Sequence, residues 1–235
     1  MKKFSLFSAT LFVVIVLSCI SCGYLFSNFL IAADAFNTTI VTIDKQTIFV
    51  LSVFESEDKS DLTSMKSELK ANGKAGVIFE KDNKFYLLAD AFENKADGEK
   101  VKTNLMQYEN CKLLKIEFEK QKYEGSFSAD EKKVLTECLQ EKFEIFKKLF
   151  NISVSLDTNI IDEKKAKSMC NNVFSCHIKT KTNFETYFDK SKFVDIENHL
   201  QNTTALLSKL IEDDKTNQNF LSFIKETYIN ILFEK

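Results

Sequence analysis

The stretch KAGVIFEKDNKFYLLADAFEN, from Lys74 to Asn94, decides the fold. Two runs of alternating apolar and polar residues, 75–80 and 84–91, flank the polar segment KDN. Asp and Asn tolerate the left-handed backbone that tight turns require, so this stretch predicts an antiparallel β-hairpin. The segments on either side of the hairpin must then supply the elements that pair with it and cover it.

Two further strands are expected, one on each side of the hairpin. The segment TIFVLSVF (47–54) precedes it and is rich in β-branched and aromatic residues, which favour strands. The segment CKLLKIEF (111–118) follows it and is expected to supply the last strand. Together with the hairpin, these segments predict four strands.

Two amphipathic helices are expected between these strands. The first has Ser56 as a candidate N-cap and Gly73 just past its end, and the second begins after Asn94. The apolar stripes of the two helices consist of Leu62, Met65 and Leu69 in the first and of Val101, Leu105 and Tyr108 in the second.

The resulting order βαββαβ predicts an α+β, ferredoxin-like or RNP-like fold: a four-stranded antiparallel sheet with both helices on one face. Strand alternation places Phe49 and Phe85 on the helix-covered face. The opposite face is expected to be open, and it carries Val50, Ser52, Tyr86, Leu88 and Asp90.

The chain from 126 to 235 predicts a separate all-α domain. Ser128 and Glu131 form a capping box ahead of a long helical pattern. Further helices are expected near 162–174, 190–213 and 216–233. No low-complexity linker separates this region from the sheet domain (47–120), which allows the two to pack closely.

The N-terminal segment predicts a membrane anchor. Lys2 and Lys3 precede an uncharged stretch, Phe4 to Ala33, that is long enough to cross a hydrocarbon core of about 30 Å as a helix. We therefore expect a single-pass signal anchor over 1–35, a spacer over 36–46 and an extracytoplasmic remainder. Two alternatives stay open: cleavage near Ala33–Ala35, or lipidation of Cys19 or Cys22.

Composition argues against a nucleic-acid partner. All 32 basic residues of the 235 are lysine, and the formal net charge is −2. Lysine lacks the planar fork with which arginine binds phosphates and base edges. Four cysteines follow the membrane segment, and the sequence cannot decide among their pairings or a free state: Cys111, Cys138, Cys170 and Cys176.

Catalytic, metal and cofactor sites are not predicted. Cys176 and His177 are adjacent, but zinc sites need further ligands, and the only other histidine is His199. Neighbouring side chains usually diverge, which disfavours a Cys/His dyad. The acidic residues lie in lysine-interleaved helical runs that are typical of solvated surfaces, and no nucleophile or phosphate-binding motif occurs. We expect a protein that is not an enzyme.

The segment from Thr47 to Phe118 resembles a SPOR domain, the peptidoglycan-binding module of bacterial cell-division and sporulation proteins. The resemblance rests on VFESEDKSD after the first strand, LKANGK at the end of the first helix, the hairpin, and AFENKADGEKVKTNL after it. It implies that the open sheet face binds septal glycan strands. Tyr86 would then stack on a sugar ring, Ser52 and Asp90 would hydrogen-bond hydroxyls, and Val50 and Leu88 would lie in the same site.

The sequence also departs from the SPOR pattern. Where that family commonly has a glutamine, and a glycine two residues later, this chain has Val50 and Ser52, and Asp90 stands at the usual glycine of the third strand. Val50 and Leu88 make this face more apolar than a glycan platform, and exposed apolar patches usually mark interfaces. The alternative is therefore a membrane-tethered scaffold whose sheet face packs on the helical region, or on envelope or divisome proteins, without glycan binding.

Overall fold

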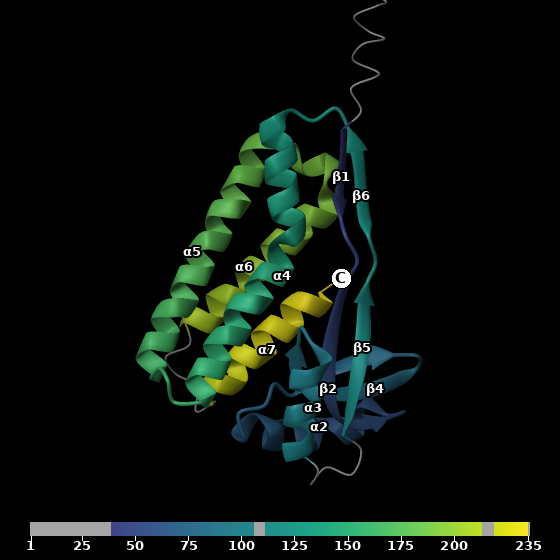
Figure 1. Cartoon of the computed structure of the whole chain (residues 1–235), viewed down its shortest axis with the longest axis vertical. Helices are drawn as coiled ribbons and strands as arrows, with labels where there is room; N and C mark the ends of the chain where they lie inside the picture. Colours follow the sequence, from purple (N-terminus) through teal and green to yellow (C-terminus); the bar gives the residue numbers. More distant parts are fainter. Residues whose placement is uncertain (1–38, 106–110, 213–218, 235) are drawn as a thin grey trace, which may run out of the picture.

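A computed structural model describes residues 39–105, 111–212 and 219–234 of the chain, and its secondary structure has the predicted α+β order. A four-stranded antiparallel sheet of βαββαβ-like order precedes a helical region (Figure 1). The elements are β1 (Thr39–Ile43), β2 (Gln46–Ser56), α2 (Lys59–Ala71), β3 (Val77–Lys81), β4 (Lys84–Phe92), α3 (Lys95–Asn104), β5 (Lys112–Phe118), β6 (Gln121–Gly125), α4 (Ala129–Asp157), α5 (Glu163–Tyr187), the short 3₁₀ helix η1 (Lys190–Lys192), α6 (Val194–Glu212) and α7 (Phe220–Phe233).

The predicted membrane segment, Phe4 to Ala33, lies outside the described residues, and so do Cys19 and Cys22. Within the ranges that the structure describes, no helix is both long enough and apolar enough to span a bilayer.

The hairpin at the centre of the sequence argument is formed by β3 and β4. Asp82 and Asn83 connect the strands with φ angles of 53° and 58°, the left-handed backbone expected of a two-residue hairpin turn. The sheet order is β3-β4-β2-β5, so β3 and β5 are its edge strands. The predicted hairpin is thus confirmed.

Helices α2 and α3 cover one face of this sheet, as predicted. Leu62 and Leu69 of α2 are fully buried with the Leu51 and Leu87 side chains of the sheet. The side chain of Asn94 accepts a hydrogen bond from an α3 backbone N–H, which confirms it as the N-cap of that helix.

The predicted N-cap of α2 was wrong by two residues. Asp58 is the cap, and its carboxylate accepts the Ser60 N–H at 2.8 Å. The Ser56 hydroxyl instead donates to the Asp61 carboxylate at 2.7 Å. The predicted end of this helix is confirmed, because Gly73 follows the C-cap residue with φ +69°.

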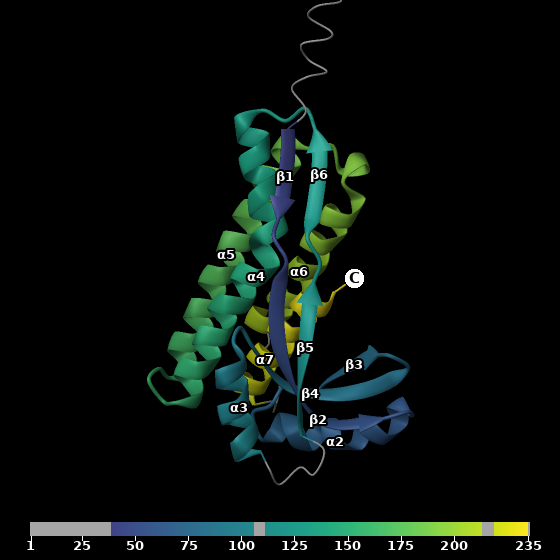
Figure 2. The same cartoon turned by 45° about the vertical axis from the view of Figure 1, so that its right-hand side comes forward.

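A two-stranded ribbon occupies the region expected to be a spacer. Strand β1 pairs antiparallel with β6, and the pairing continues in the same register into β2 and β5: Ile43 lies opposite Gln121, and Gln46 lies opposite Phe118. The ribbon runs from the sheet along the helical region (Figure 2). Five-residue strands give a weak sequence signal, which is why both were missed.

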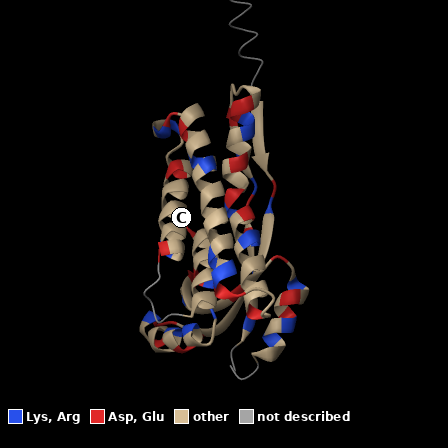
Figure 3. Ribbon diagram, turned by 90° about the vertical axis from the view of Figure 1, so that its left-hand side faces the viewer, with Lys and Arg blue, Asp and Glu red and all other residues tan. Residues whose placement is uncertain are grey.

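The helical region consists of α4 to α7 and shares an apolar core with the sheet. The capping box of Ser128 and Glu131 begins α4, as predicted. The largest buried cluster combines sheet residues such as Val50 and Leu88 with helical residues such as Phe146. A second cluster joins β1 to α4, α5 and α6. Acidic and basic residues are interspersed along the helices (Figure 3).

Candidate functional site

The sheet face that was predicted to be open is covered. Val50 and Leu88 have no exposed surface, Ser52 is 1% exposed and Asp90 is 4% exposed. Of the five predicted site residues only Tyr86 is half-buried, and it packs against the same core cluster. The expectation of an open face was therefore wrong. The face is covered because α7, an apolar helix that must bury its own side chains, lies against β3 and β4.

A charged cluster lies within this covered interface. The Nζ atom of Lys225 is 2.8 Å from Oδ2 of Asp90, and both side chains are more than nine-tenths buried. The Tyr228 hydroxyl donates to Oδ1 of the same carboxylate, which also accepts the Ala91 N–H at 2.8 Å. Asp90 thus serves as a structural anion that binds α7, and its oxygens are not available to a sugar.

Burial also changes the ionisation of groups around this cluster. Desolvation raises the pKa of Tyr228 well above its usual range, and the negative charge of Asp90 raises it further. Desolvation lowers the pKa of Lys74, with a further contribution from the nearby Lys225 ammonium. The interface therefore favours a neutral Tyr228, and it holds the buried Lys225 side chain against Asp90.

Contacts at the rim hold α7 against the α2 end of the sheet domain. Glu226 of α7 forms ion pairs with Lys66 and Lys70 of α2. The Ser222 hydroxyl donates to the Lys74 carbonyl oxygen at 2.6 Å. The sheet face is thus closed by apolar contact, a buried ion pair and hydrogen bonds together.

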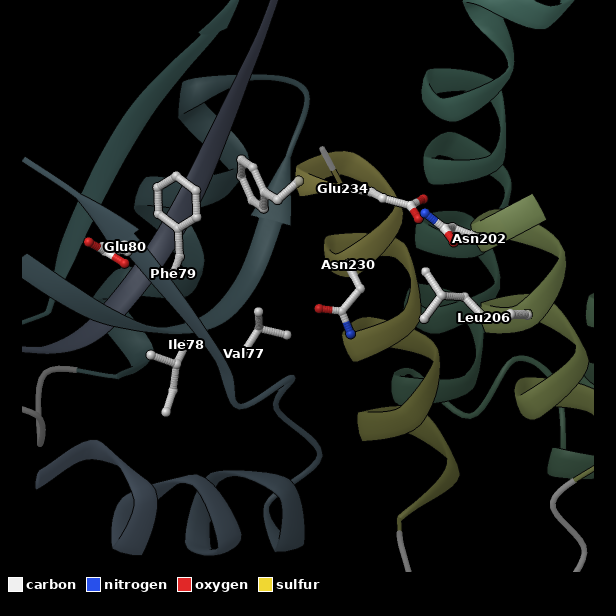
Figure 4. Close-up of a pocket in the computed structure, with 10 residues that line it drawn as sticks. Val77, Ile78, Phe79, Glu80, Asn202, Leu206, Asn230 and Glu234 are labelled. Atoms are coloured by element: carbon white, nitrogen blue, oxygen red, sulfur yellow. The ribbon is translucent and has the colours of Figure 1, made fainter. Parts of the chain in front are cut away.

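A groove lies beside β3 at this junction. It has a volume of about 470 Å³ and separates the β3 edge from α6 and α7 (Figure 4). Aromatic and aliphatic side chains form much of its surface, and the rings of Phe79 and Phe233 lie 4.5 Å apart, centroid to centroid. Its lining residues are Val77, Ile78, Phe79, Glu80, Asn202, Ala205, Leu206, Asn230, Phe233 and Glu234. Periodicity in the sequence could not identify this site, because its walls come from three elements that meet only in the fold.

The histidine considered as a metal ligand has a structural environment. Nδ1 of His177 lies 3.1 Å from the Glu141 carboxylate, and Nε2 lies 2.8 Å from the Thr204 hydroxyl. These contacts join α4, α5 and α6 and leave neither ring nitrogen free for Cys176, which is exposed. Among the described residues, no group of three His, Cys, Asp or Glu side chains is arranged to hold a metal ion.

The four described cysteines are free thiols. Cys138 and Cys170 are buried, and desolvation raises the pKa of each to about 12. Cys170 and Cys176 lie on the same helix, α5, where six residues of separation keep them from pairing. Cys138 and Cys170 are therefore buried thiols of the core, Cys111 is partly buried and Cys176 is an exposed thiol.

Comparison of the chain with known protein families, with curated proteins and with solved structures gave no match in any of the three. The SPOR resemblance thus stays a prediction that rests on the quoted motifs, and function must be argued from the geometry above.

Proposed function

We propose that this chain is a membrane-tethered, non-catalytic protein-interaction module of the bacterial cell envelope. In this proposal the SPOR-like sheet acts as a scaffold for the helical region and does not bind glycan strands through its sheet face. The tether is the apolar segment from Phe4 to Ala33, and the envelope location follows from that segment and from the SPOR resemblance.

One observation carries the proposal: α7 occupies the face that would have to meet a sugar. A glycan could contact Val50 or Leu88 only if α7 moved away, which would expose an apolar surface and separate Lys225 from Asp90. Leaving a buried charge without its partner costs about 3–5 kcal/mol. Weak hydrogen bonds to sugar hydroxyls, each worth about 1 kcal/mol, do not readily offset that cost.

The groove beside β3 supports the interaction half of the proposal. It is concave, largely apolar and bordered by a few polar groups, which is the usual character of a binding site.

Sedimentation with purified cell-wall sacculi tests this function. Protein spanning residues 36–235 is mixed with intact sacculi and with sacculi whose stem peptides have been removed by an amidase. We expect the protein to remain in the supernatant in both cases, while a SPOR domain of established glycan affinity pellets with the stripped sacculi. The positive control excludes a defective sacculus preparation.

Glycan binding is the competing outcome of the same assay. Pelleting that increases on stripped sacculi and decreases in Tyr86→Ala would overturn the proposal, because Tyr86 is the half-buried member of the predicted glycan site. Ser52→Ala serves as the matched control, since the Ser52 hydroxyl is buried and donates to the Phe54 carbonyl oxygen.

A further inference from the structure

We propose that the free edge of β3 and the groove beside it bind an extended, basic segment of a partner protein, which adds to the sheet as a strand next to β3. This inference rests on the proposed function, since it names the class of partner that the interaction module would take.

The first support is the unpaired backbone of β3. Lys81 and Lys84 flank the two-residue turn and form a hydrogen-bonded pair, so the Phe79–Tyr86 pair is also hydrogen-bonded. The N–H and C=O groups of Ile78 and Glu80 consequently point away from β4. Within the described residues β3 has no strand on that side, and no other backbone group bonds there. Such an edge is a template for an added strand.

The second support is the apolar surface next to this edge. Side chains of an added strand alternate between the two sheet faces, so every second one would enter the groove. There they would meet Phe79 of β3, Phe233 of α7 and Leu206 of α6 (Figure 4). We therefore expect the partner segment to carry aromatic or aliphatic residues at alternate positions.

The third support is the charge next to the β3 edge. Glu234 lines the groove. Glu80 pairs with Phe85, so its side chain lies on the opposite face of the sheet from Phe79, beside the positions that alternate with the groove-facing residues of an added strand. Glu80 forms no ion pair with a described residue, and the charged partner found for Glu234 in the described part of the chain is His199, at 3.6 Å. Asn202 and Asn230 add side-chain amides that make no hydrogen bond to described residues and can bind a peptide backbone. The Glu80 carboxylate, which has no cationic partner among the described residues, favours a segment that carries lysine or arginine at the positions that alternate with its apolar residues.

Charge also argues against a second copy of this chain as the occupant. In two copies paired antiparallel through β3, the face that carries Glu80 would receive Ile78 and Glu80 of the second copy, while its Lys81 would lie on the groove face. Like charges placed close together destabilise an interface. A segment with cationic side chains on that face complements Glu80 better than a second copy of the chain does.

Amide exchange measured by NMR tests the proposal directly. The probe is the synthetic peptide Lys-Phe-Lys-Val-Lys-Phe-Lys, and the control is the same peptide with Glu in place of every Lys. Added to protein spanning residues 36–235, the basic peptide should slow exchange of the Ile78 and Glu80 amides and leave the Phe79 amide, already paired with β4, unchanged. The acidic peptide should bind at least about tenfold more weakly.

Three variants sharpen the test. Ile78→Pro removes one outward N–H at an edge position that tolerates proline. Glu80→Lys reverses the charge beside the edge, on the face opposite the groove. Each should weaken binding of the basic peptide by about tenfold or more. Ile78→Val keeps the N–H and should bind as the parent protein does. Far-UV circular dichroism checks that each variant is folded. If Ile78→Pro is unfolded, the binding measured for Glu80→Lys tests the proposal.

Three outcomes would overturn the inference: no binding of the basic peptide, binding unchanged by both Ile78→Pro and Glu80→Lys, or slow exchange of Ile78 and Glu80 in concentrated protein without peptide. The last would make a second copy the occupant. None of these results alters the sacculus experiment, so a failure here is distinguishable from a failure of the proposed function.

Discussion

The two faces of the four-stranded sheet are covered in different ways. Helices α2 and α3 are the sheet's own crossover connections, and the cluster between them and the sheet is built from apolar side chains such as Leu51, Leu62 and Leu87. Helix α7 covers the other face from far along the chain, and its Tyr228 bonds Asp90 across 138 positions of sequence. That interface includes a buried ion pair. Helices that are adjacent in sequence to the strands, such as α2 and α3, need only an apolar stripe to cover the sheet. A helix far along the chain, such as α7, gains its orientation from a specific charged contact.

Removing the cation from the α7 face should have the largest effect. Lys225→Met leaves the Asp90 carboxylate buried without its ammonium, and we expect the free energy of unfolding to fall by about 3–5 kcal/mol. Urea denaturation monitored by circular dichroism measures it.

Two controls accompany this variant. Lys100→Met replaces a side chain that is 78% exposed and should change stability by no more than about 0.5 kcal/mol. The double variant Asp90→Asn with Lys225→Met removes both charges and should recover much of the loss. If the double variant is as unstable as Lys225→Met alone, the charge of Asp90 is not the cause.

Cavity-forming substitutions on the two faces should cost similar amounts but act in different places. Leu62→Ala on α2 and Ile224→Ala on α7 each truncate a fully buried side chain, for an expected loss of about 2–5 kcal/mol. Hydrogen exchange should speed up in α7 amides for Ile224→Ala and much less for Leu62→Ala. An equal increase of the α7 exchange rate in both variants would mean that α7 and the helices α2 and α3 open as one cooperative unit.

Alkaline pH should act mainly on the helical side of the molecule. The folded-state pKa of Cys138 and of Cys170 is raised to about 12, while unfolded thiols ionise near pH 8.5–9. The folded chain therefore binds more protons above about pH 9, and stability falls there by up to about 1.4 kcal/mol per pH unit for each thiol. Urea denaturation in reducing buffer from pH 7 to 11 measures the slope, which should be shallower in the Cys138→Ala, Cys170→Ala double variant.

The smallest effect is expected at the end of a local helix. Asn94→Ala removes the N-cap of α3 and should cost about 1 kcal/mol. Asn94→Gly should cost only a few tenths of a kcal/mol, because glycine is an acceptable cap. Hydrogen exchange of the first α3 amides should become faster, while exchange of the α7 amides should not change. Faster exchange in α7 would show that the helices on the two sheet faces do not open independently.

The sequence predicted the local elements well because each carries its own signal. Asp82 and Asn83 mark the hairpin turn, Asn94 and Ser128 mark helix starts, and alternation along β4 assigns residues to faces correctly. Strand alternation does not predict which element, distant in sequence, packs on a given face of the sheet. Asp90 was assigned to the correct face and to the wrong role, since its partner Lys225 lies in a helix whose position depends on the whole fold.

The candidate site was less predictable for the same reason. The apolar character of Val50 and Leu88 did indicate that this face would meet protein, and the structure places α7 there. The groove, by contrast, brings together Phe79, Leu206 and Phe233, which no spacing rule connects. Contacts of this kind depend on tertiary packing and carry no short-range pattern.

The two-stranded ribbon of β1 and β6, which continues into β2 and β5, has a mechanical consequence. Thr39, the first described residue, lies at one end of the molecule's long axis, and the hairpin of β3 and β4 lies toward the other (Figure 2). When the chain is pulled through the residues that precede Thr39, tension runs along β1, parallel to the strand. The backbone bonds between β1 and β6 then resist in shear, all together, and do not break in succession. The ribbon would thus transmit tension from the chain that precedes Thr39 to the sheet that carries the β3 groove.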